Sequence, residues 1–343
     1  MPERVKFTMK DVARLAGVST STVSAVINET VTVSPERRAR VQQAMAALDY
    51  QPDAIARSLK TGRSNAIGLV VPDITNPFYP ELIRGAEEAG QAAGYSVLLC
   101  DSSEDHRIEE RQLSALFARR VDGVILACCA NSRAFEMMAR RRMPVIFIDR
   151  LPAAATANTV CTDNVKAGQM AAEHLIQLGH ERIGMLAGNL ELSPHRDRLE
   201  GFRKAMQESH LPILDEYLIT GDVQVDDGFS AGKRMLELAS PPTAIMASNN
   251  KLLLGVLQAI DDKGVTIPDD LSVLGFDDYL WNQHFNPTLT AVAQPTREIG
   301  RKSFELLREI IDRSSDEEQA SPVRLSLPAE LRIRKSTAPP KRA

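Results

Sequence analysis

Apolar residues recur at helical spacing over the first fifty residues, which predicts three short helices around one core. The inward positions fall into three groups: Val12, Leu15 and Ala16; Val23, Val26 and Ile27; Val41, Ala44, Met45 and Leu48. Gly17 supplies the backbone freedom for a tight turn between the first two helices. Thr8 with Asp11 fits a capping box, Ser19 can cap the second helix, and residues 34–36 (Ser-Pro-Glu) begin the third.

The second helix leaves Thr20, Ser21, Ser24 and Ala25 on its outer face. Hydroxyl groups crowded on one exposed face are unusual for a helix that only meets solvent, and they can bond to base edges. We therefore predict a helix-turn-helix domain whose second helix enters the major groove of DNA while the first crosses the phosphates. The alternative is an ordinary three-helix bundle that binds nothing.

From Asn65 onward, continuous apolar runs alternate with amphipathic stretches. The predicted strands are 66–71, 95–101, 121–127, 144–149, 158–161, 182–188, 217–222, 243–248 and 271–277, with further strand segments near 323–334. The predicted helices are 79–93, 104–119, 132–141, 164–178, 196–209, 227–239, 250–263 and 297–312. Such alternation indicates parallel sheets covered on both faces, and this many units predict two doubly wound lobes.

The chain, 343 residues long, is too long for one ordinary core, and four segments are expected. They are an all-α head (1–51), a hinge helix and linker (52–64), an α/β body (65–335) and a loose tail (336–343). Within the body, the first lobe would take 65–160 and 293–321, and the second lobe 161–292 and 322–335.

Charge is distributed unevenly along the chain. Residues 1–64 hold ten Lys/Arg against six Asp/Glu, and the remainder holds 31 against 39. A basic head on an acidic body fits a phosphate-binding module attached to a body that avoids DNA. Cys100, Cys128, Cys129 and Cys161 lack zinc or disulfide spacing, so buried free thiols and no metal site are expected. The absence of a signal peptide and of a long apolar span predicts a soluble, cytoplasmic protein.

Several segments, in this order and spacing, resemble the lactose-repressor/galactose-repressor (LacI/GalR) family of transcriptional regulators over nearly the full length. They include KDVARLAGVSTSTVSAVIN, IGLVVPDITNPFY, LGHERIGMLAG, LSVLGFDD and NPTLTAVAQP. The resemblance implies a homodimer that binds a pseudo-palindromic operator in double-stranded DNA. A tetramer is less favoured because the sequence lacks a C-terminal leucine heptad. It also implies a body like periplasmic sugar-binding proteins, with a small-molecule effector between its lobes and no cofactor. Repression controlled by that effector is the expected function.

The resemblance places Thr20 and Ser21 at the main base-reading positions. Ala25 departs from the polar residue usual in the family: its methyl group can touch a thymine methyl but cannot make a bidentate guanine contact. Leu59 would wedge into the central base step of the minor groove, or would merely pack the hinge helices together. The expected DNA contacts are Thr8, Ser19, Thr20, Ser21, Thr22, Ala25, Asn28, Ala56, Leu59 and Lys60.

The family's effector contacts correspond to Phe78, Tyr79, Asp149, Arg150, Arg198, Asn249 and Asp277. Most of them follow a predicted strand, where open α/β sheets bind ligands. Asp277 and Asn249 would bond paired hydroxyls, while Arg198 would fork onto two oxygens. Two departures are Val223, where an aromatic residue is common, and Asn250, where Asp is usual.

Arg196 lies two residues before Arg198 in the sequence, so three arginines, Arg150, Arg196 and Arg198, are expected at this site. Three are more than a neutral sugar needs, so the hypothesis is an acidic effector such as an aldonic or keto-aldonic acid of the gluconate type. The alternative is that Arg196 and Arg150 pair with Asp197, Asp149 or other acids.

Trp281, the single tryptophan, is a further candidate effector contact, or it packs a lobe edge or a dimer interface. His174 and His180 lack metal-ligand spacing and are expected to be surface or capping groups.

A dehydrogenase is disfavoured because the first body strand lacks a G-x-G-x-x-G turn, and no P-loop, nucleophile elbow or zinc motif is present, so no catalytic residue is expected. A periplasmic binding protein would need a signal peptide, and a sugar-processing enzyme with a DNA-binding head is the remaining alternative.

Overall fold

The structure is a computed structural model that describes residues 7–28, 33–50, 62–151, 157–313 and 321–341. The chain divides into two compact units, residues 1–64 and 65–343, and each is described by itself. Within the described residues, no helix is long and apolar enough to cross a membrane.

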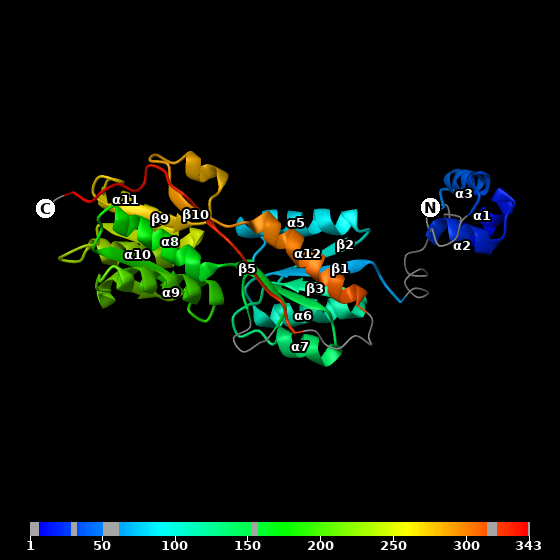
Figure 1. Ribbon diagram of the computed structural model, residues 1–343, viewed down its shortest axis with the longest axis horizontal. Helices are drawn as coiled ribbons and strands as arrows, with labels where there is room; N and C mark the ends of the chain where they lie inside the picture. The colour runs from blue at the N-terminus through cyan, green and yellow to red at the C-terminus, as the bar shows by residue number, and fades with distance from the viewer. Residues whose placement is uncertain (1–6, 29–32, 51–61, 152–156, 314–320, 342–343) are drawn as a thin grey trace, which may run out of the picture. The chain divides into compact units, whose positions relative to one another are not determined.

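The first unit contains the three predicted helices, α1 (Met9–Ala16), α2 (Thr20–Asn28) and α3 (Pro35–Ala47) (Figure 1). Their common core consists of Val12, Ala13, Ala16, Val23, Val26, Val41 and Ala44. The inward placement of Leu15 was wrong: this side chain is 56% exposed, and Ala13 is buried instead. On a helix, Ala13 and Leu15 lie at equal angles on either side of the face that Val12 and Ala16 share, so spacing alone does not distinguish them. Packing against α2 and α3 buries the side of the helix that carries Ala13.

The turn and caps of this unit follow the sequence prediction closely. Gly17 adopts a left-handed backbone conformation with φ of 61° between α1 and α2. Ser19 Oγ accepts the backbone N–H of Thr22 at 3.2 Å and so caps α2. Ser34 occupies the N-cap of α3, but it contributes its carbonyl, which accepts the N–H of Arg38 at 3.0 Å, and not its hydroxyl.

The second unit begins with a lobe built on a parallel six-stranded sheet of order β11-β5-β4-β3-β1-β2 (Figure 1). Its strands are β1 (Ala66–Val71), β2 (Ser96–Asp101), β3 (Gly123–Leu126), β4 (Val145–Ile148), β5 (Thr159–Thr162) and β11 (Arg324–Leu327). Helices α5 (Phe78–Ala92) and α12 (Thr296–Asp312) share one core with the sheet, and α6 (His106–Ala118) and α7 (Ala134–Arg141) share the core on the other face.

The other lobe repeats this design, with the sheet order β12-β10-β9-β8-β6-β7. Its strands are β6 (Ile183–Gly188), β7 (Leu218–Thr220), β8 (Ala244–Ala247), β9 (Ser272–Phe276), β10 (Thr290–Ala293) and β12 (Glu330–Arg332), of which only β12 is antiparallel to its neighbour. Helices α8 (Asn164–Gln177) and α9 (Ser193–Glu208) cover one face, and α10 (Val225–Leu236) and α11 (Asn250–Lys263) the other. The short helices η1 (Asp215–Tyr217) and η2 (Leu280–Gln283) complete it. Two doubly wound lobes are therefore confirmed, and β4 and β9 hold equivalent positions.

The lobe boundaries differ from the prediction at two points. Strand β5 extends to Thr162 in the first sheet, and residues 324–327 pair with β5, although 322–335 had been assigned entirely to the second lobe. Strand β11 has only four residues, and its two leucines, Leu325 and Leu327, are too short a pattern to indicate which sheet it joins. The return of the chain to the second lobe lies between β11 and β12.

The C-terminal segment is fixed, and its description as a loose tail was wrong for residues 336–341. Ser336 is fully buried, and its hydroxyl donates to the carbonyl of Val273 at 2.6 Å. His174 and His180, expected to be surface or capping groups, are buried and hold the same segment: Nε2 of His180 lies 2.9 Å from the Ala338 carbonyl oxygen. The segment has no apolar periodicity because hydroxyl and backbone hydrogen bonds anchor it.

Candidate functional site

The outer face of α2 carries hydroxyl groups and no charged side chain. Thr20 and Ser21 are exposed, whereas Thr22 and Ala25 are half-buried. Ser19 Oγ lies 2.7 Å from Ser21 Oγ and 2.9 Å from Thr22 Oγ1. These hydroxyls form one network in which each group can donate and accept, so the face can bond to base edges or phosphate oxygens.

Thr8, an expected DNA contact, forms the predicted cap of α1. Its backbone N–H and its Oγ1 donate to Asp11 Oδ2 at 2.9 and 2.7 Å, and these two bonds hold the pKa of Asp11 below its usual value. The side chain therefore already has a structural role at the helix start. The other expected contacts lie outside the described part of the chain: the side chain of Asn28 and the hinge residues Ala56, Leu59 and Lys60.

In the body, two aspartates hold the same position in the two lobes. Asp149 directly follows β4 and Asp277 directly follows β9, and both have left-handed backbones, with φ of 54° and 73°. Non-glycine residues in this region are strained and persist where their surroundings fix them. The Tyr79 hydroxyl donates to Asp149 Oδ2 at 3.1 Å, and Gln294 Nε2 donates to Asp277 Oδ1 at 2.6 Å. Both carboxylates lie at the strand ends where such sheets bind ligands.

Arg198 on α9 is 3% exposed and interacts with the charges of both aspartates. Its Nε donates to Asn164 Oδ1 at 2.8 Å, its Nη1 donates to the Ser248 carbonyl at 2.5 Å, and the guanidinium lies 4.2 Å over the ring of Phe276. Gly168 permits this arrangement, because a Cβ atom there would overlap the carbonyl oxygen of Arg198 and push α8 from α9. The cation is thus fixed by its own lobe.

Burial is the largest influence on this group of charges. It raises the pKa of Asp149 and of Asp277, against the lowering effects of Arg150 and Arg198. It also lowers the pKa of Arg198, although the two aspartates favour the charged form. The opposite charges of these groups offset only part of the cost of their burial. A ligand rich in hydroxyl groups would therefore find both hydrogen-bond donors and acceptors here.

Arg150 and Arg196 do not provide free positive charge. Arg150 Nη1 and Nη2 donate to the two carboxylate oxygens of Glu104 at 2.6 and 2.9 Å, and Arg150 Nε lies 3.8 Å from Asp149 Oδ2. The Arg196 side chain is 50% exposed and pairs with Asp197 at 3.6 Å. The expectation of three available arginines was therefore wrong, and the alternative in which Arg150 and Arg196 pair with nearby acids is confirmed.

The aromatic and amide candidates also have structural partners. Phe78 and Tyr79 are buried in the core of the first lobe, with their rings edge-to-face at 5.0 Å, so Tyr79 reaches the aspartates only through its hydroxyl. Asn249 Oδ1 accepts a backbone N–H of α11 at 2.8 Å and caps that helix. Trp281 is 42% exposed, and its ring centroid lies 4.7 Å from that of Tyr279.

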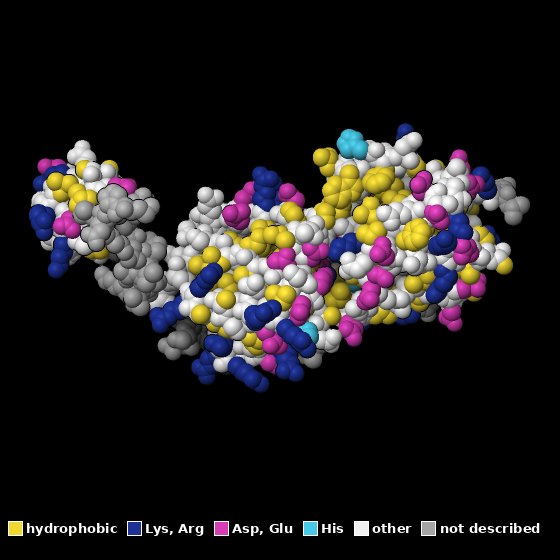
Figure 2. All heavy atoms as spheres, turned by 180° about the vertical axis from the view of Figure 1, so that it is seen from behind, with side chains coloured by type: hydrophobic (Ala, Val, Ile, Leu, Met, Phe, Trp, Pro, Cys, Tyr) yellow, Lys and Arg dark blue, Asp and Glu magenta, His cyan; other side chains and the backbone are white. Residues whose placement is uncertain are grey.

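Hydrophobic side chains gather on one face of the second lobe, over the segment that carries η2 (Figure 2). The exposed apolar residues of this segment are Leu280, Trp281 and Phe285, with exposed fractions of 74%, 42% and 37%. Three large apolar side chains in six residues form a patch that a partner molecule could cover.

Four polar residues at the interlobe site were not predicted as site residues: Glu104, Asn164, Ser248 and Gln294. Gln294 Oε1 accepts the hydroxyl of Thr162 at 2.7 Å, and its Nε2 reaches Asp277, so it links two lobe-crossing segments. His195 Nδ1 lies 2.9 Å from Ser248 Oγ beneath Arg198. A sequence signal existed for Gln294, the next-to-last residue of the segment NPTLTAVAQP, and for His195, which directly precedes Arg196 beside the predicted site.

The two lobes contact each other beside this site. In the described part of the chain, the hydrogen bonds that join them include, donor first, Lys251 Nζ to Asp73 Oδ2 (2.9 Å), Asn250 Nδ2 to Asn76 Oδ1 (3.2 Å) and Leu151 N to Ser193 Oγ (3.1 Å). Asn250, noted in the sequence as a departure, thus makes a contact between the lobes. Because these bonds cross the site, any ligand that changes the distance between the lobes changes them too.

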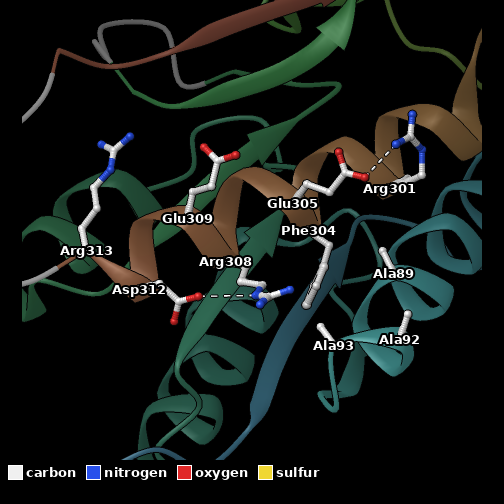
Figure 3. A pocket seen from close by; sticks show the side chains of 10 residues that line it. All are labelled: Ala89, Ala92, Ala93, Arg301, Phe304, Glu305, Arg308, Glu309, Asp312 and Arg313. Carbon is white, nitrogen blue, oxygen red and sulfur yellow. Dashed lines mark hydrogen bonds and ion pairs between the residues drawn. The ribbon is translucent and has the colours of Figure 1, made fainter.

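A separate groove of about 780 Å³ lies between the outer faces of α5 and α12 (Figure 3). Its floor includes Ala89, Ala93 and Phe304. Two arginines on its wall are paired, Arg301 with Glu305 at 2.7 Å and Arg308 with Asp312 at 3.4 Å. None of the expected effector contacts lines this groove, so it is a different surface from the interlobe site.

Fold and site together define a class of protein: a helix-turn-helix head joined to a two-lobed ligand-binding body. Family models agree with this division. Residues 8–53 match the bacterial regulatory proteins of the lacI family, and residues 64–335 match the periplasmic binding proteins and sugar binding domain of the LacI family. The chain belongs to the LacI family: it is a DNA-binding transcriptional repressor with a sugar-binding domain.

Individual relatives cover almost the whole chain. The ribose operon repressor of Escherichia coli K12 is 38% identical over 88% of this chain and 92% of its own. The repressor PurR of Photobacterium profundum is 36% identical over 96% and 98%. Among solved structures, a lac repressor dimer bound to operator and the anti-inducer ONPF aligns with a TM-score of 0.85 at 28% identity, over 97% and 99% of the chains. A LacI family regulator of Enterococcus faecium with bound ribose gives 0.69 at 30% identity, over 80% and 99%.

Proposed function

We propose that a neutral pentose of the ribose type, bound between the two lobes, controls this repressor. The observation that carries the proposal is the state of the arginines: Arg150 is paired with Glu104, Arg198 with its own lobe, and Arg196 lies at the surface. An acidic effector would need an unpaired cation, whereas a neutral sugar needs acceptors for its hydroxyls. Asp149 and Asp277 are such acceptors.

The relatives point to the same class of ligand. The 38% identical relative is a ribose operon repressor, and one structural neighbour at 30% identity holds ribose. The gluconate-type effector expected from the sequence is not supported by any of these relatives. A purine base is the competing ligand because relatives named PurR match 96% of the chain. Val223 argues against it, since a valine offers less stacking surface to a planar ring than an aromatic residue would.

We propose that α2 lies in the major groove, with Thr20 and Ser21 at base edges and Ala25 against a thymine methyl. The exposure of Thr20 and Ser21 on a face free of charge supports base contact rather than phosphate contact. Ser19, Thr22, Thr8 and Asn28 would position the head on the phosphates. The hinge residues Ala56, Leu59 and Lys60 would enter the minor groove.

Two copies of the chain would occupy the two halves of a pseudo-palindromic operator. The exposed patch of Leu280, Trp281 and Phe285 supports a homodimer, because a second copy would remove this apolar surface from water. Ligand binding would then change the closure of the lobes and thereby the spacing of the two hinges. DNA affinity can change only by the differential affinity of the ligand for the two states, about 1–3 kcal/mol in typical allosteric systems.

An operator mobility shift, run with the full-length protein over a ligand panel, tests this proposal. The panel contains ribose, other neutral pentoses and hexoses, gluconate and hypoxanthine, at one fixed salt concentration. We expect retardation of a promoter fragment that a neutral pentose alone alters, and a higher melting temperature with the same pentose. A response to gluconate or hypoxanthine in its place would overturn the pentose assignment. A protein that retards no operator fragment under any of these conditions would overturn the DNA assignments.

A further inference from the structure

We propose that Glu104 is a specificity-determining residue of the interlobe site: it keeps Arg150 paired and so excludes anionic sugars. This inference rests on the proposed function, because it assigns charge selection to a residue beside the proposed pentose site. Glu104 lies in the loop between β2 and α6, away in sequence from every residue expected to contact the effector.

The loop holds Glu104 in a fixed and strained conformation. Ser103 and Glu104 both have left-handed backbones, with φ of 50° and 58°. Two hydrogen bonds fix them: the N–H of Glu104 donates to the Pro72 carbonyl at 2.7 Å, and the N–H of Ser103 donates to Asp101 Oδ1 at 2.6 Å. Consecutive strained residues persist where their environment requires them, and here they direct a carboxylate at Arg150.

The pair itself leaves Arg150 able to bind hydroxyls but not acids. Both terminal nitrogens of Arg150 donate to Glu104 in a parallel fork, which is the arrangement that a ligand carboxylate or phosphate would otherwise occupy. The Arg150 side chain is only 9% exposed, and that of Glu104 is 35% exposed. The guanidinium keeps further N–H groups, and these can still donate to neutral oxygens.

The charges around the site also disfavour an anionic ligand. Glu104, Asp149 and Asp277 face two cations, Arg150 and Arg198. An anionic ligand would therefore add a fourth negative charge to a site that holds only these two positive charges. Without Glu104 the remaining charges would balance, and the fork of Arg150 would accept the carboxylate of a sugar acid.

The test compares two ligands that differ in one charged group. Full-length wild-type protein and the variant Glu104→Gln are titrated with D-ribose and with D-ribonate, the aldonic acid of the same pentose. We expect Glu104→Gln to lower the ratio of the ribonate Kd to the ribose Kd by about tenfold or more, the scale of one hydrogen bond to a charged group. Glu104→Asp, which retains the charge, should keep the ratio near that of the wild type.

The matched control is Glu88→Gln. Glu88 also forms a short pair with an arginine on the α5–α12 surface: Nη2 of Arg297 donates to both of its carboxylate oxygens, at 2.6 and 2.7 Å. Its loss should leave the ligand ratio unchanged. In a second variant, Glu104→Gln combined with Arg150→Gln, the gained ribonate binding should disappear.

The ratio separates specificity from folding, since a loosened structure weakens both ligands alike. An unchanged ratio in Glu104→Gln, or equal weakening of ribose and ribonate, would overturn the role of Glu104 while the proposed function stands. A wild-type protein that binds no neutral pentose would instead overturn the proposed function, and this inference with it.

Discussion

The two lobes place an aspartate at the same point of the same sheet order, but they compensate its charge differently. Asp277 in the second lobe faces Arg198, which Asn164 and a backbone carbonyl hold in place. Asp149 in the first lobe lies next to Arg150, whose fork is directed to Glu104. The second lobe thus presents a fixed cation, and the first lobe presents one that is neutralised internally. We conclude that equivalent strand ends of a duplicated fold can supply different chemistry to one ligand.

The largest effect is expected when the fixed cation is removed. Arg198→Met should lower the free energy of unfolding by about 3–5 kcal/mol, because buried carboxylates lose their cation. Arg150→Met should cost less, since the carboxylate of Glu104 is 35% exposed and water can solvate it, while buried Asp149 keeps Arg198 as a neighbouring cation. Urea unfolding of the two variants measures this difference. Equal losses in the two lobes would show that the cations are held in the same way.

The next effect concerns the two aspartates as ligand acceptors. Asp149→Asn and Asp277→Asn should each weaken pentose binding by about 10- to 100-fold, the range for a hydrogen bond to a charged group. Asp262→Asn is the control: this acid pairs with Lys233 at 3.6 Å on the surface of the second lobe and should leave affinity unchanged. Calorimetric titration gives the affinities. A variant at either aspartate with wild-type affinity would remove that residue from the site.

A smaller effect follows from the raised pKa values of Asp149 and Asp277. Hydroxyl donors need ionised acceptors, so pentose affinity should fall as the pH is lowered through these raised pKa values. For stability the sign is opposite. An acid with a pKa raised in the folded state stabilises that state below its unfolded pKa, and this contribution is lost as the pH rises through the folded value. The stability of Asp277→Asn relative to wild type should therefore improve as the pH rises from about 4, the unfolded pKa of an aspartate, through the raised folded value. A flat difference would contradict the raised pKa.

The parts of this molecule differ in how far the sequence predicts them. Most strands of both sheets were found because buried parallel strands are continuous apolar runs, but the short strand β10 (Thr290–Ala293) was missed. Asp149 and Asp277 were found from the family resemblance, and each follows such a run. Glu104 and Asn164 were missed because their roles come from partners 46 and 34 residues away in the sequence. The fixed segment at Ser336 was missed for a related reason: its anchors are hydrogen bonds, which leave no hydrophobic pattern.

The smallest effect concerns the contact between the lobes. Lys251→Ala removes the bond to Asp73, a pair that is 24% and 16% exposed, and should weaken pentose binding only about two- to fivefold, since such partly exposed pairs contribute up to about 1 kcal/mol. Lys263→Ala removes an equally direct bond, to Glu237 at 2.6 Å, but within the second lobe. If closure of the lobes is coupled to binding, only Lys251→Ala changes ligand affinity. Equal affinities in the two variants would mean that the bridge between the lobes does not favour the ligand-bound state, and that the difference between the lobes lies in their aspartates alone.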